Sequence, residues 1–402
     1  MTDLNYVFSD KLAGLKPSAI REIFKNLTDP EIISFAAGNP AAESFPVKEL
    51  AKLSEEIFAD NAVAALQYSI TEGYAPLRDA VKKRQKEKFG IGRDFDTTII
   101  VSGGQQGIEL ACKTFCNEGD AVICDNPSFI GALNAFRSNG ARTVGVNMES
   151  DGMDTDELER VVRETPNAKM IYTIPTFQNP SGITMSVGKR KRIYEIAKKY
   201  GLIIFEDNPY GELRFSGEEI PTIKSMDEDG IVVYCSSFSK ILSAGMRVGF
   251  VIAPDEITSK MVVAKQSEDV HTNIFFQMLC YRYITRYDLD GHIERIREIY
   301  RRKSSLMLRC LDSAFQSDRI TFTRPDGGLF IWGTVSGIDD ISPFVKAALE
   351  KKVAVVPGST FNCDTSKTSP SFRLNYSTPS DEQIAIGTAR LGEAFAGFCR
   401  EN

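Results

Sequence analysis

Between about Asp96 and Pro254 the sequence alternates short apolar runs with segments of helical periodicity, and this alternation constrains the fold more than any other feature. Three of the apolar runs are TTIIV from Thr97, AVIC from Ala121 and KMIYTI from Lys169. Short apolar runs between helices are typical of strands that are covered on both faces. The pattern therefore predicts an α/β fold with a mostly parallel sheet and right-handed crossovers.

The two flanks of this region have a different pattern. Residues 1–46 are rich in loops, and the C-terminal part mixes short strands with helices, for example in GLFIWGTV and SFRLNYS. A chain of 402 residues is too long for one compact core and suits two domains. We predict a large domain at residues 47–290, a smaller α+β domain at residues 291–402, and an N-terminal segment at residues 1–46 that joins the small domain.

Composition argues against several classes of function. The net charge of −6 is unfavourable for a general binder of nucleic-acid backbones, which needs an excess of Lys and Arg. No apolar run approaches the roughly 18 residues that a membrane helix needs, and the N-terminus does not resemble a secretory signal. The eight cysteines form no C-x-x-C pair and suit reduced thiols in a cytoplasmic protein. Neither His271 nor His292 has the spacing of metal ligands, so no metal site is expected.

Two charged residues follow buried strands. Lys240 comes shortly after the apolar run GIVVYC, and Asp207 comes at the end of LIIFED. Burial near a strand end lowers the pKa of a lysine and makes its amine a usable nucleophile. An ionised aspartate at such a position is costly unless it meets a cation. Taken alone, Lys240 would also suit an exposed loop.

Further polar and aromatic residues follow neighbouring strands, where open α/β sheets bind their ligands. Asn179 lies in the turn PTFQNPSG, and Tyr210 follows Asp207 by three residues. Gly104 lies in a glycine-rich turn between a strand and a helix, whose free amides suit an anion, although the same turn suits simple chain reversal. Phe129, about one turn into the next helix, suits either ring stacking or the core.

Taken together, these residues suit one ligand, pyridoxal 5′-phosphate (PLP). Its aldehyde suits the amine of Lys240. Its ring nitrogen suits Asp207, because the carboxylate keeps that nitrogen protonated and the ring then accepts electrons. Its phenolic oxygen suits Asn179 and Tyr210, and its ring face suits Phe129. The residues that suit its phosphate are Gly104, Gln105, Ser237 and Arg247.

Four motifs carry a resemblance to a known family. SFSK with an arginine seven residues after the lysine, NPSG, D-x-x-Y and SFRLNYS occur in the order found in fold-type I aminotransferases of class I/II, which the chain resembles over nearly its whole length. LQYSITEGYAPLRDAV, GGQQGIEL and PSAIREI resemble the 2-aminoadipate/kynurenine aminotransferase branch. The resemblance implies transfer of an amino group between an L-amino acid and a 2-oxo acid such as 2-oxoglutarate. Candidate donors are 2-aminoadipate and aromatic or aliphatic amino acids.

The resemblance also implies roles for individual residues. Lys240 would form the internal aldimine with PLP and later move a proton between the substrate Cα and C4′ of the cofactor. Asp207 would hold the pyridine nitrogen, and Asn179 and Tyr210 would bind the 3′ oxygen. Arg373 would grip the substrate α-carboxylate through two hydrogen bonds, a task that suits a planar guanidinium.

Other implied contacts involve the phosphate, the backbone and a second subunit. Tyr68 matches a phosphate ligand that the neighbouring subunit donates, which implies a homodimer with shared active sites. Gly38, in FAAGNP, matches a backbone contact near the substrate. The phosphate ligands within one subunit would be Gly104, Gln105, Ser237 and Arg247.

Two positions depart from the family pattern, and one pair of residues bears on the substrate. Phe129 stands where many relatives carry a tyrosine, so stacking is kept while a hydroxyl hydrogen bond is lost. Gly104 stands where the branch has a phosphate-binding serine. Arg21 matches a position that meets a distal carboxylate in the aminoadipate branch, with Ser18 one turn before it. The same arginine would also suit the surface of a helix.

Two alternatives to transamination stay open at this point. A PLP-dependent β-lyase or related carbanion enzyme would share the fold and the cofactor, and Arg373 argues against decarboxylation but not against a lyase. A regulator that uses this fold as a ligand sensor would carry an N-terminal winged helix. Residues 1–46 show no helix-turn-helix pattern and no basic excess, which argues against the regulator.

Overall fold

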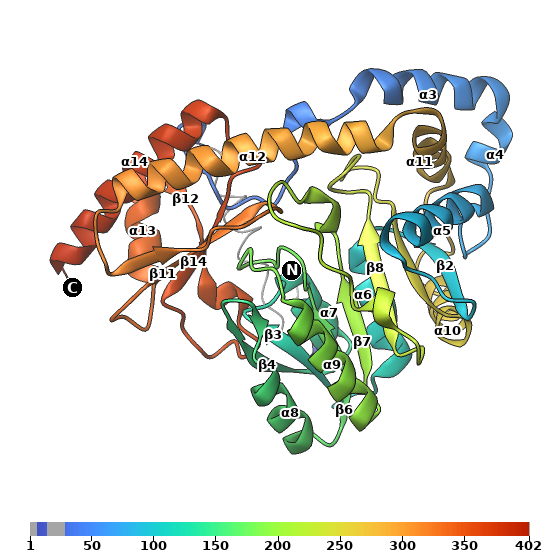
Figure 1. Cartoon of the computed structure of the whole chain (residues 1–402), viewed down its shortest axis with the longest axis horizontal. Coiled ribbons are helices and arrows are strands. Elements are labelled where there is room, and N and C mark those ends of the chain that lie inside the picture. Colours follow the sequence, from blue (N-terminus) through green and yellow to red (C-terminus); the bar gives the residue numbers. More distant parts are fainter. Residues whose placement is uncertain (1–5, 14–28, 402) are drawn as a thin grey trace.

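The computed structural model describes residues 6–13 and 29–401, and its largest element is a twisted sheet (Figure 1). In these residues the sheet has eight strands in the order β2-β9-β8-β7-β6-β3-β4-β5. Their bounds are β2 Asp96–Val101, β3 Ala121–Asn126, β4 Arg142–Glu149, β5 Gly152–Met153, β6 Ala168–Thr173, β7 Ile203–Asp207, β8 Val232–Ser237 and β9 Gly249–Pro254. The neighbours from β8 to β4 pair in parallel, whereas β9, β2 and β5 pair antiparallel. The prediction of a mostly parallel α/β sheet is confirmed.

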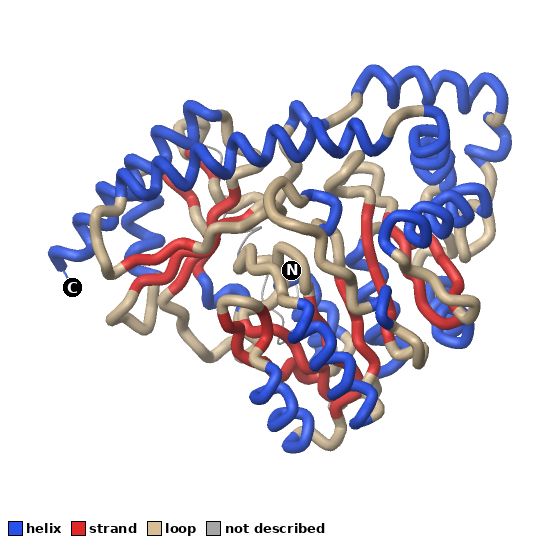
Figure 2. The backbone as a smooth tube through the Cα atoms, viewed as in Figure 1, coloured by secondary structure: helices blue, strands red, loops and turns tan. Residues whose placement is uncertain are grey.

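Helices cover both faces of this sheet, as Figure 2 shows, because successive strand residues point to opposite faces and both sets are apolar. Ile171 and Ile204 belong to a core cluster with residues of α8 and α9. Tyr172 and Phe205, one position further along the same strands, belong to the main core with residues of α6 and α7. The bounds of these helices are α6 Gly104–Phe115, α7 Ile130–Ser138, α8 Thr155–Glu164 and α9 Val187–Tyr200.

A second, antiparallel sheet of order β10-β11-β14-β13 lies beside the first (Figure 1). Its strands are β10 Ile320–Phe322, β11 Phe330–Val335, β13 Val356–Pro357 and β14 Ser371–Asn375, and its neighbouring helices are α12 Leu289–Ala314, α13 Ser342–Glu350 and α14 Asp381–Glu401. The short strand β1 (Ile33–Ser34) pairs in parallel with β12 (Val353–Ala354). Residues near the N-terminus therefore pack against the C-terminal part of the chain.

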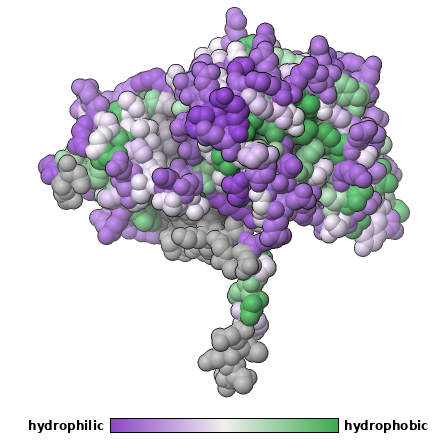
Figure 3. Space-filling view, turned by 90° about the horizontal axis from the view of Figure 1, so that it is seen from below, coloured by the Kyte–Doolittle hydropathy of each residue, from purple (hydrophilic) through white to green (hydrophobic). Residues whose placement is uncertain are grey.

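The other elements are short or lie at the periphery. They are α1 Asp10–Ala13, η1 Ala42–Ser44, α3 Val47–Asp60, α4 Ala62–Leu66, α5 Ala75–Phe89, η2 Gly211–Leu213, η3 Lys224–Met226, α10 Asp255–Gln266, α11 Ile274–Arg286 and η4 Gly358–Phe361. In Figure 3 the coloured stretch between the grey portions projects from the body, and its apolar residues Tyr6, Val7 and Phe8 are exposed. None of the described helices is long and apolar enough to cross a bilayer.

The carboxyl ends of the parallel strands carry polar residues at one edge of the large sheet. Thr173 ends β6, Asp207 ends β7 and Ser237 ends β8. Because β2 lies antiparallel to β9, which is antiparallel to β8, β2 also ends at this edge, and α6 begins there at Gly104. The polar residues at the ends of these strands, which are far apart in the sequence, therefore lie together at the carboxyl edge of the large sheet.

Lys224 is a buried lysine that stabilises the other end of the large sheet. Its Nζ donates to Asp96 Oδ1 at 2.7 Å, to Asp227 Oδ2 at 2.8 Å and to Val232 O at 3.0 Å. The three side chains are almost fully buried, with at most 1% of any of them exposed. All three ammonium protons have acceptors, so the buried charge is fully compensated.

We expect Lys224→Met to lower the free energy of unfolding by about 3–5 kcal/mol, because two buried carboxylates lose their cation. Chemical denaturation followed by circular dichroism measures this change. Lys191→Met, at an exposed position of α9, is the matched control and should change stability by less than about 0.5 kcal/mol. Equal stabilities of the two variants would contradict the assigned role of Lys224.

Candidate active site

The amine of Lys240 lies at the carboxyl edge of the large sheet, in the connection between β8 and β9. Its Nζ donates to the carbonyl of Gly38 at 2.8 Å and lies 5.9 Å from the ring centroid of Tyr210. Burial, together with the charges of Arg247 and Arg373, lowers the pKa of Lys240 to about 8. Near neutral pH this amine is therefore neutral, and able to act as a nucleophile, far more often than an ordinary lysine amine is.

Asp207 is a buried carboxylate at the end of β7, at the same edge of the sheet. Burial raises its pKa to about 7, while a hydrogen bond from the hydroxyl of Tyr172 to Oδ2, at 2.7 Å, opposes the rise. In the described residues, the hydrogen bonds of this side chain use only Oδ2. Tyr172 lies in β6, and the register between β6 and β7 places it opposite Phe205. Asp207 Oδ1 is thus left for a cationic group.

Arg373 comes from β14 of the small sheet and reaches the same edge. It is 2% exposed, and it donates from Nη1 to Asn179 Oδ1 at 2.7 Å and from Nη2 to the carbonyl of Ala36 at 2.8 Å. Its guanidinium lies 4.3 Å from the ring centroid of Phe330 and 4.9 Å from that of Phe361. Its Nε has no hydrogen-bond partner in the described residues. Burial lowers the pKa of Arg373 to about 10, so the side chain stays cationic and suits an anion.

A second cationic group faces the start of α6. Arg247 adopts a left-handed backbone conformation with φ of 53°, and its Nη2 donates to the carbonyl of Ser102 at 3.2 Å. Gly103 has φ of 81°, and a Cβ at this position would lie 2.2 Å from Arg247 Nη2, so only glycine fits. The free amides at the N-terminus of α6 therefore lie beside a guanidinium, an arrangement that suits a phosphate.

The hydroxyl of Ser237 belongs to the same group of residues. Ser237 Oγ donates to Ser239 Oγ at 2.7 Å, and Arg247 Nη1 donates to Ser239 Oγ at 3.4 Å. Gln105 is exposed in the first turn of α6, and its Nε2 donates to the carbonyl of Gly131 at 2.8 Å.

Phe129 immediately precedes α7 and is half-buried. A Cβ at Gly131 would lie 2.4 Å from the tip of the Phe129 ring. Glycine at residue 131 therefore leaves the space that the ring occupies.

The predicted site residues do not all meet. Lys240 contacts Gly38 and Tyr210, Arg373 contacts Asn179, and a Cβ at Gly104 would lie 3.9 Å from Asp207 Oδ1. Tyr68 is different, because it is 82% exposed and its ring lies 5.9 Å from that of His271, while none of its described contacts reaches Lys240. Ser18 and Arg21 lie outside the described residues.

Sequence reasoning missed four residues that contact this group: Tyr172, Ser239, Phe330 and Phe361. Tyr172 has a signal in the sequence, because a tyrosine near the end of a buried strand needs a partner for its hydroxyl. Ser239 stands in the quoted motif SFSK. The two phenylalanines look like ordinary core residues, and only their packing on Arg373 distinguishes them.

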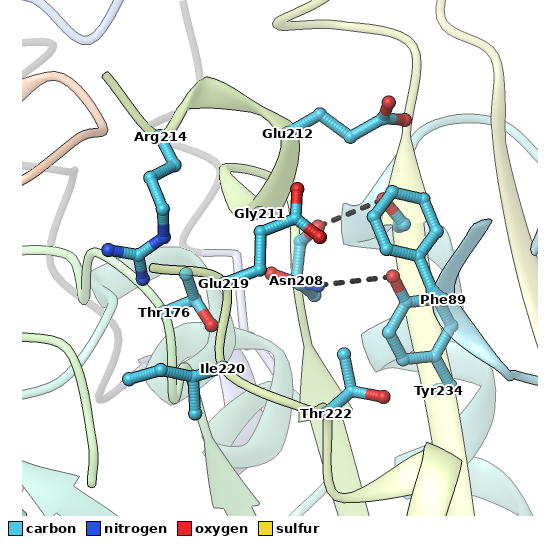
Figure 4. A pocket seen from close by; sticks show the side chains of 11 residues that line it. Phe89, Thr176, Asn208, Gly211, Glu212, Arg214, Glu219, Ile220, Thr222 and Tyr234 are labelled. Atoms are coloured by element: carbon cyan, nitrogen blue, oxygen red, sulfur yellow. Dashed lines mark hydrogen bonds between the residues drawn. The ribbon is translucent and has the colours of Figure 1, made fainter. Parts of the chain in front are cut away.

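A small cavity lies beside the group but does not suit a large ligand (Figure 4). Its volume is about 40 Å³, and its lining includes Asn208, Arg214 and Tyr234. Asn208 Nδ2 donates to the hydroxyl of Tyr234 in β8 at 3.1 Å. Such a volume holds only a few water molecules. In the described residues, no group of three or more His, Cys, Asp or Glu side chains is placed to hold a metal ion.

Comparison with known proteins identifies the family. The family model "Aminotransferase class I and II" matches residues 30–391. The chain is 39% identical to aromatic-amino-acid aminotransferase 1 of Thermococcus litoralis, covering 97% of this chain and 94% of that protein. It is 38% identical to 2-aminoadipate transaminase of Thermus thermophilus, covering 97% of each. A crystal structure of Pyrococcus horikoshii kynurenine aminotransferase, in complex with PMP, superposes with a TM-score of 0.93 at 36% identity over 97% of each chain.

The chain belongs to the class I and II aminotransferase family. It is a PLP-dependent enzyme of fold type I that moves amino groups between amino acids and 2-oxo acids. The predicted resemblance to this family, and to its 2-aminoadipate and kynurenine aminotransferases, is confirmed.

The residues at the sheet edge fit this cofactor. The amine of Lys240, with its lowered pKa, suits an aldehyde, and Asp207 Oδ1, which takes no hydrogen bond from the described residues, suits a protonated ring nitrogen. The Arg247 guanidinium beside the start of α6 suits a phosphate group. These three features come from different segments and face one region.

We expect the reactivity of Lys240 in cofactor-free protein to follow its lowered pKa. Reductive methylation with formaldehyde and cyanoborohydride needs the free amine, so its rate at Lys240 should rise with pH and level off just above the pKa of about 8. An unstructured peptide with one lysine, added to the same sample, is the reference, and its rate should keep rising toward the ordinary lysine pKa of about 10.4. Mass spectrometry measures both amines in one sample, and identical pH profiles would contradict the assignment.

Proposed function

We propose that this aminotransferase acts through Lys240 as the group that binds the cofactor and moves the substrate proton, with Arg373 as the ligand of the substrate α-carboxylate. The observation that carries the proposal is the convergence of half-buried Lys240 and buried Arg373, neither of which forms an ion pair in the described residues, at the sheet edge that also bears Asp207. The proposed donors are 2-aminoadipate, aromatic or aliphatic L-amino acids, and the proposed acceptor is a 2-oxo acid such as 2-oxoglutarate. Relatives with aromatic amino acid and 2-aminoadipate activities support these donors.

Lys240 has the properties of a base for the substrate Cα proton. Burial is the main cause that lowers its pKa to about 8, so the neutral amine is accessible near neutral pH, and the Gly38 carbonyl orients it at 2.8 Å. PLP, when bound, supplies an electron-accepting ring that makes such a proton acidic enough to remove. A lysine with a pKa near the working pH both accepts and returns a proton efficiently.

Arg373 orients the substrate. Nη1 donates one hydrogen to Asn179 and Nη2 donates one to the carbonyl of Ala36. The Nε hydrogen and the second hydrogens of Nη1 and Nη2 are therefore available to a carboxylate. The rings of Phe330 and Phe361 hold the guanidinium plane, which reduces the entropy lost on binding. Fixing the α-carboxylate also fixes which bond at Cα faces Lys240.

The remaining assignments concern how the cofactor is held. Asp207 would pair with its ring nitrogen, and the Tyr172 hydrogen bond helps to keep this carboxylate ionised. Asn179 and Tyr210 would bind the 3′ oxygen, and Phe129 would pack on the ring. The proposed phosphate ligands are Gly104, Gln105, Ser237 and Arg247. Gly38 is proposed to contact the substrate region through its backbone, and Ser18 and Arg21 to meet a distal carboxylate.

We propose that Tyr68 serves the active site of a second copy of this chain in a homodimer. Its ring is 82% exposed, and it belongs to a run of exposed apolar residues with Val63, Leu66 and Ile70, which are 81%, 75% and 54% exposed. The same region lines a hollow of about 760 Å³. Exposed apolar residues that gather in this way mark an interaction surface.

We also propose that the chain has a large domain at residues 47–290 and a small domain at residues 291–402. The N-terminal segment at residues 1–46 would join the small domain, and the pairing of β1 with β12 supports this. The limit at residue 290 lies inside α12, which runs unbroken across both parts (Figure 1). A cytoplasmic location is supported by the eight cysteines, all of which are free thiols.

We expect the loaded enzyme, mixed with one amino donor and no acceptor, to release about one equivalent of 2-oxo acid per site, because the amino group stays on the cofactor. Chromatography of the products measures this stoichiometry. A β-lyase would instead release ammonia and pyruvate over many turnovers. The donor panel should include 2-aminoadipate and leucine, and Arg21→Ala should lower the rate on 2-aminoadipate relative to leucine.

Two variants test the assigned residues in the same assay. Borohydride reduction should link the cofactor to the peptide that contains Lys240, and Lys240→Ala should abolish this link. Arg373→Lys keeps the positive charge but cannot form two parallel hydrogen bonds to a carboxylate, so kcat/KM should fall by about a hundredfold. Release of 2-oxo acid at the wild-type rate from both variants would contradict the proposed roles.

We expect subunits of Tyr68→Ala and Lys240→Ala to complement each other if Tyr68 serves the partner's site. A hybrid dimer then has one site with both residues intact and one site with neither. In an equal mixture, about half of the dimers are hybrids, so activity should recover to about a quarter of the wild-type value. The assay is run at a cofactor concentration at which Tyr68→Ala alone is inactive, and a mixture with no recovered activity would contradict the shared site.

A further inference from the structure

Lys265 is a fully buried lysine outside the residues assigned above. It lies near the end of α10, and none of its side chain is exposed. Its Nζ donates to Asp269 Oδ1 at 2.7 Å, to Gln106 Oε1 at 2.7 Å and to Thr272 Oγ1 at 3.0 Å. A buried ammonium is costly unless its protons all have acceptors, and here they do.

The side chains that accept hydrogen bonds from Lys265 also form hydrogen bonds with Ser102. The hydroxyl of Ser102 donates to Asp269 Oδ2 at 2.7 Å and lies 3.0 Å from Thr272 Oγ1. The backbone amide of Ser102 donates to Gln106 Oε1 at 2.8 Å. Lys265 is therefore the centre of a network that fixes the hydroxyl and the amide of Ser102 from two sides.

Ser102 in turn holds the proposed phosphate ligand Arg247. Its carbonyl accepts from Arg247 Nη2 at 3.2 Å, and Gly103, the next residue, leaves no space for a Cβ beside this guanidinium. Gly104 then begins α6. The position of Ser102 therefore sets both the direction of the Arg247 guanidinium and the position of the first free amides of α6.

We propose that the buried network of Lys265, Asp269 and Ser102 is a positioning device for the phosphate of the cofactor. It rests on the proposed role of Arg247 as a phosphate ligand. The network contacts Ser102 and the first turn of α6, so its members act through other residues. Its effect is preorganisation, because a guanidinium and amides that already face the phosphate need not be ordered on binding.

The test compares pyridoxal 5′-phosphate with pyridoxal, which lacks the phosphate. Each is titrated into cofactor-free protein, and the absorbance change on linkage to Lys240 gives the two dissociation constants. Lys265→Met should raise the constant for pyridoxal 5′-phosphate about tenfold and leave that for pyridoxal unchanged. Lys260→Met, at an exposed position of the same helix, is the matched control and should behave as wild type.

Two further variants keep the result decisive. Ser102→Ala removes only a hydroxyl and should shift the ratio of the two constants in the same direction, which decides the question if Lys265→Met does not fold. An equal rise for both ligands, or an unchanged ratio in Ser102→Ala, would overturn the positioning role. Arg247→Gln separates this from the proposed function, because an unchanged ratio in Arg247→Gln would refute the phosphate assignment itself.

Discussion

Buried charge without an ionic partner is the constraint on which the site of this protein depends. Asp207, Lys240 and Arg373 are all withdrawn from solvent at one edge of the large sheet, and in the described residues none of them forms an ion pair. Two buried lysines elsewhere have ionic partners, since Lys224 has two carboxylates and Lys265 has Asp269. A folded chain retains uncompensated buried charges at a cost, and a ligand with opposite charges removes that cost.

The same edge brings together segments from the whole length of the chain. Gly38 follows β1, Lys240 lies between β8 and β9, and Arg373 lies in β14 of the small sheet. The Lys240 amine bonds to Gly38, and Arg373 bonds to Asn179 and to Ala36. Closing these contacts requires the small sheet to lie against the large one. The stability of the fold and the order of the site are therefore coupled.

Transamination follows from this arrangement and from the family to which the chain belongs. In the proposed mechanism, an amine whose pKa lies near neutral pH accepts and returns a proton, and a guanidinium packed on two rings orients a carboxylate. The phosphate side of the site is organised differently, because exposed Arg247 depends on a carbonyl and a glycine of the β2–α6 turn. The proposed reactive groups are thus held by burial, and the proposed phosphate ligand Arg247 is held by a backbone turn.

Local sequence patterns predict much of this arrangement. The alternation of apolar runs and helices determines a covered, parallel sheet, and residues that follow strands, such as Asp207 and Lys240, must lie at its carboxyl edge. The resemblance to the family suggested Arg373 as a site residue, although the distance from Lys240 along the chain says nothing about their separation in space. These inferences work because strand direction and burial follow from periodicity alone.

Long-range packing decided the rest. Tyr172 reaches Asp207 only because β6 and β7 are paired in one register, and Phe330 and Phe361 hold Arg373 only because β11 and η4 flank β14. The network around Lys265 joins α10 to the turn before α6, about 160 positions earlier in the chain. Periodicity reports which face of an element is apolar, but contacts between elements depend on side-chain shape and on the docking of whole layers. Those contacts exist only in the folded chain.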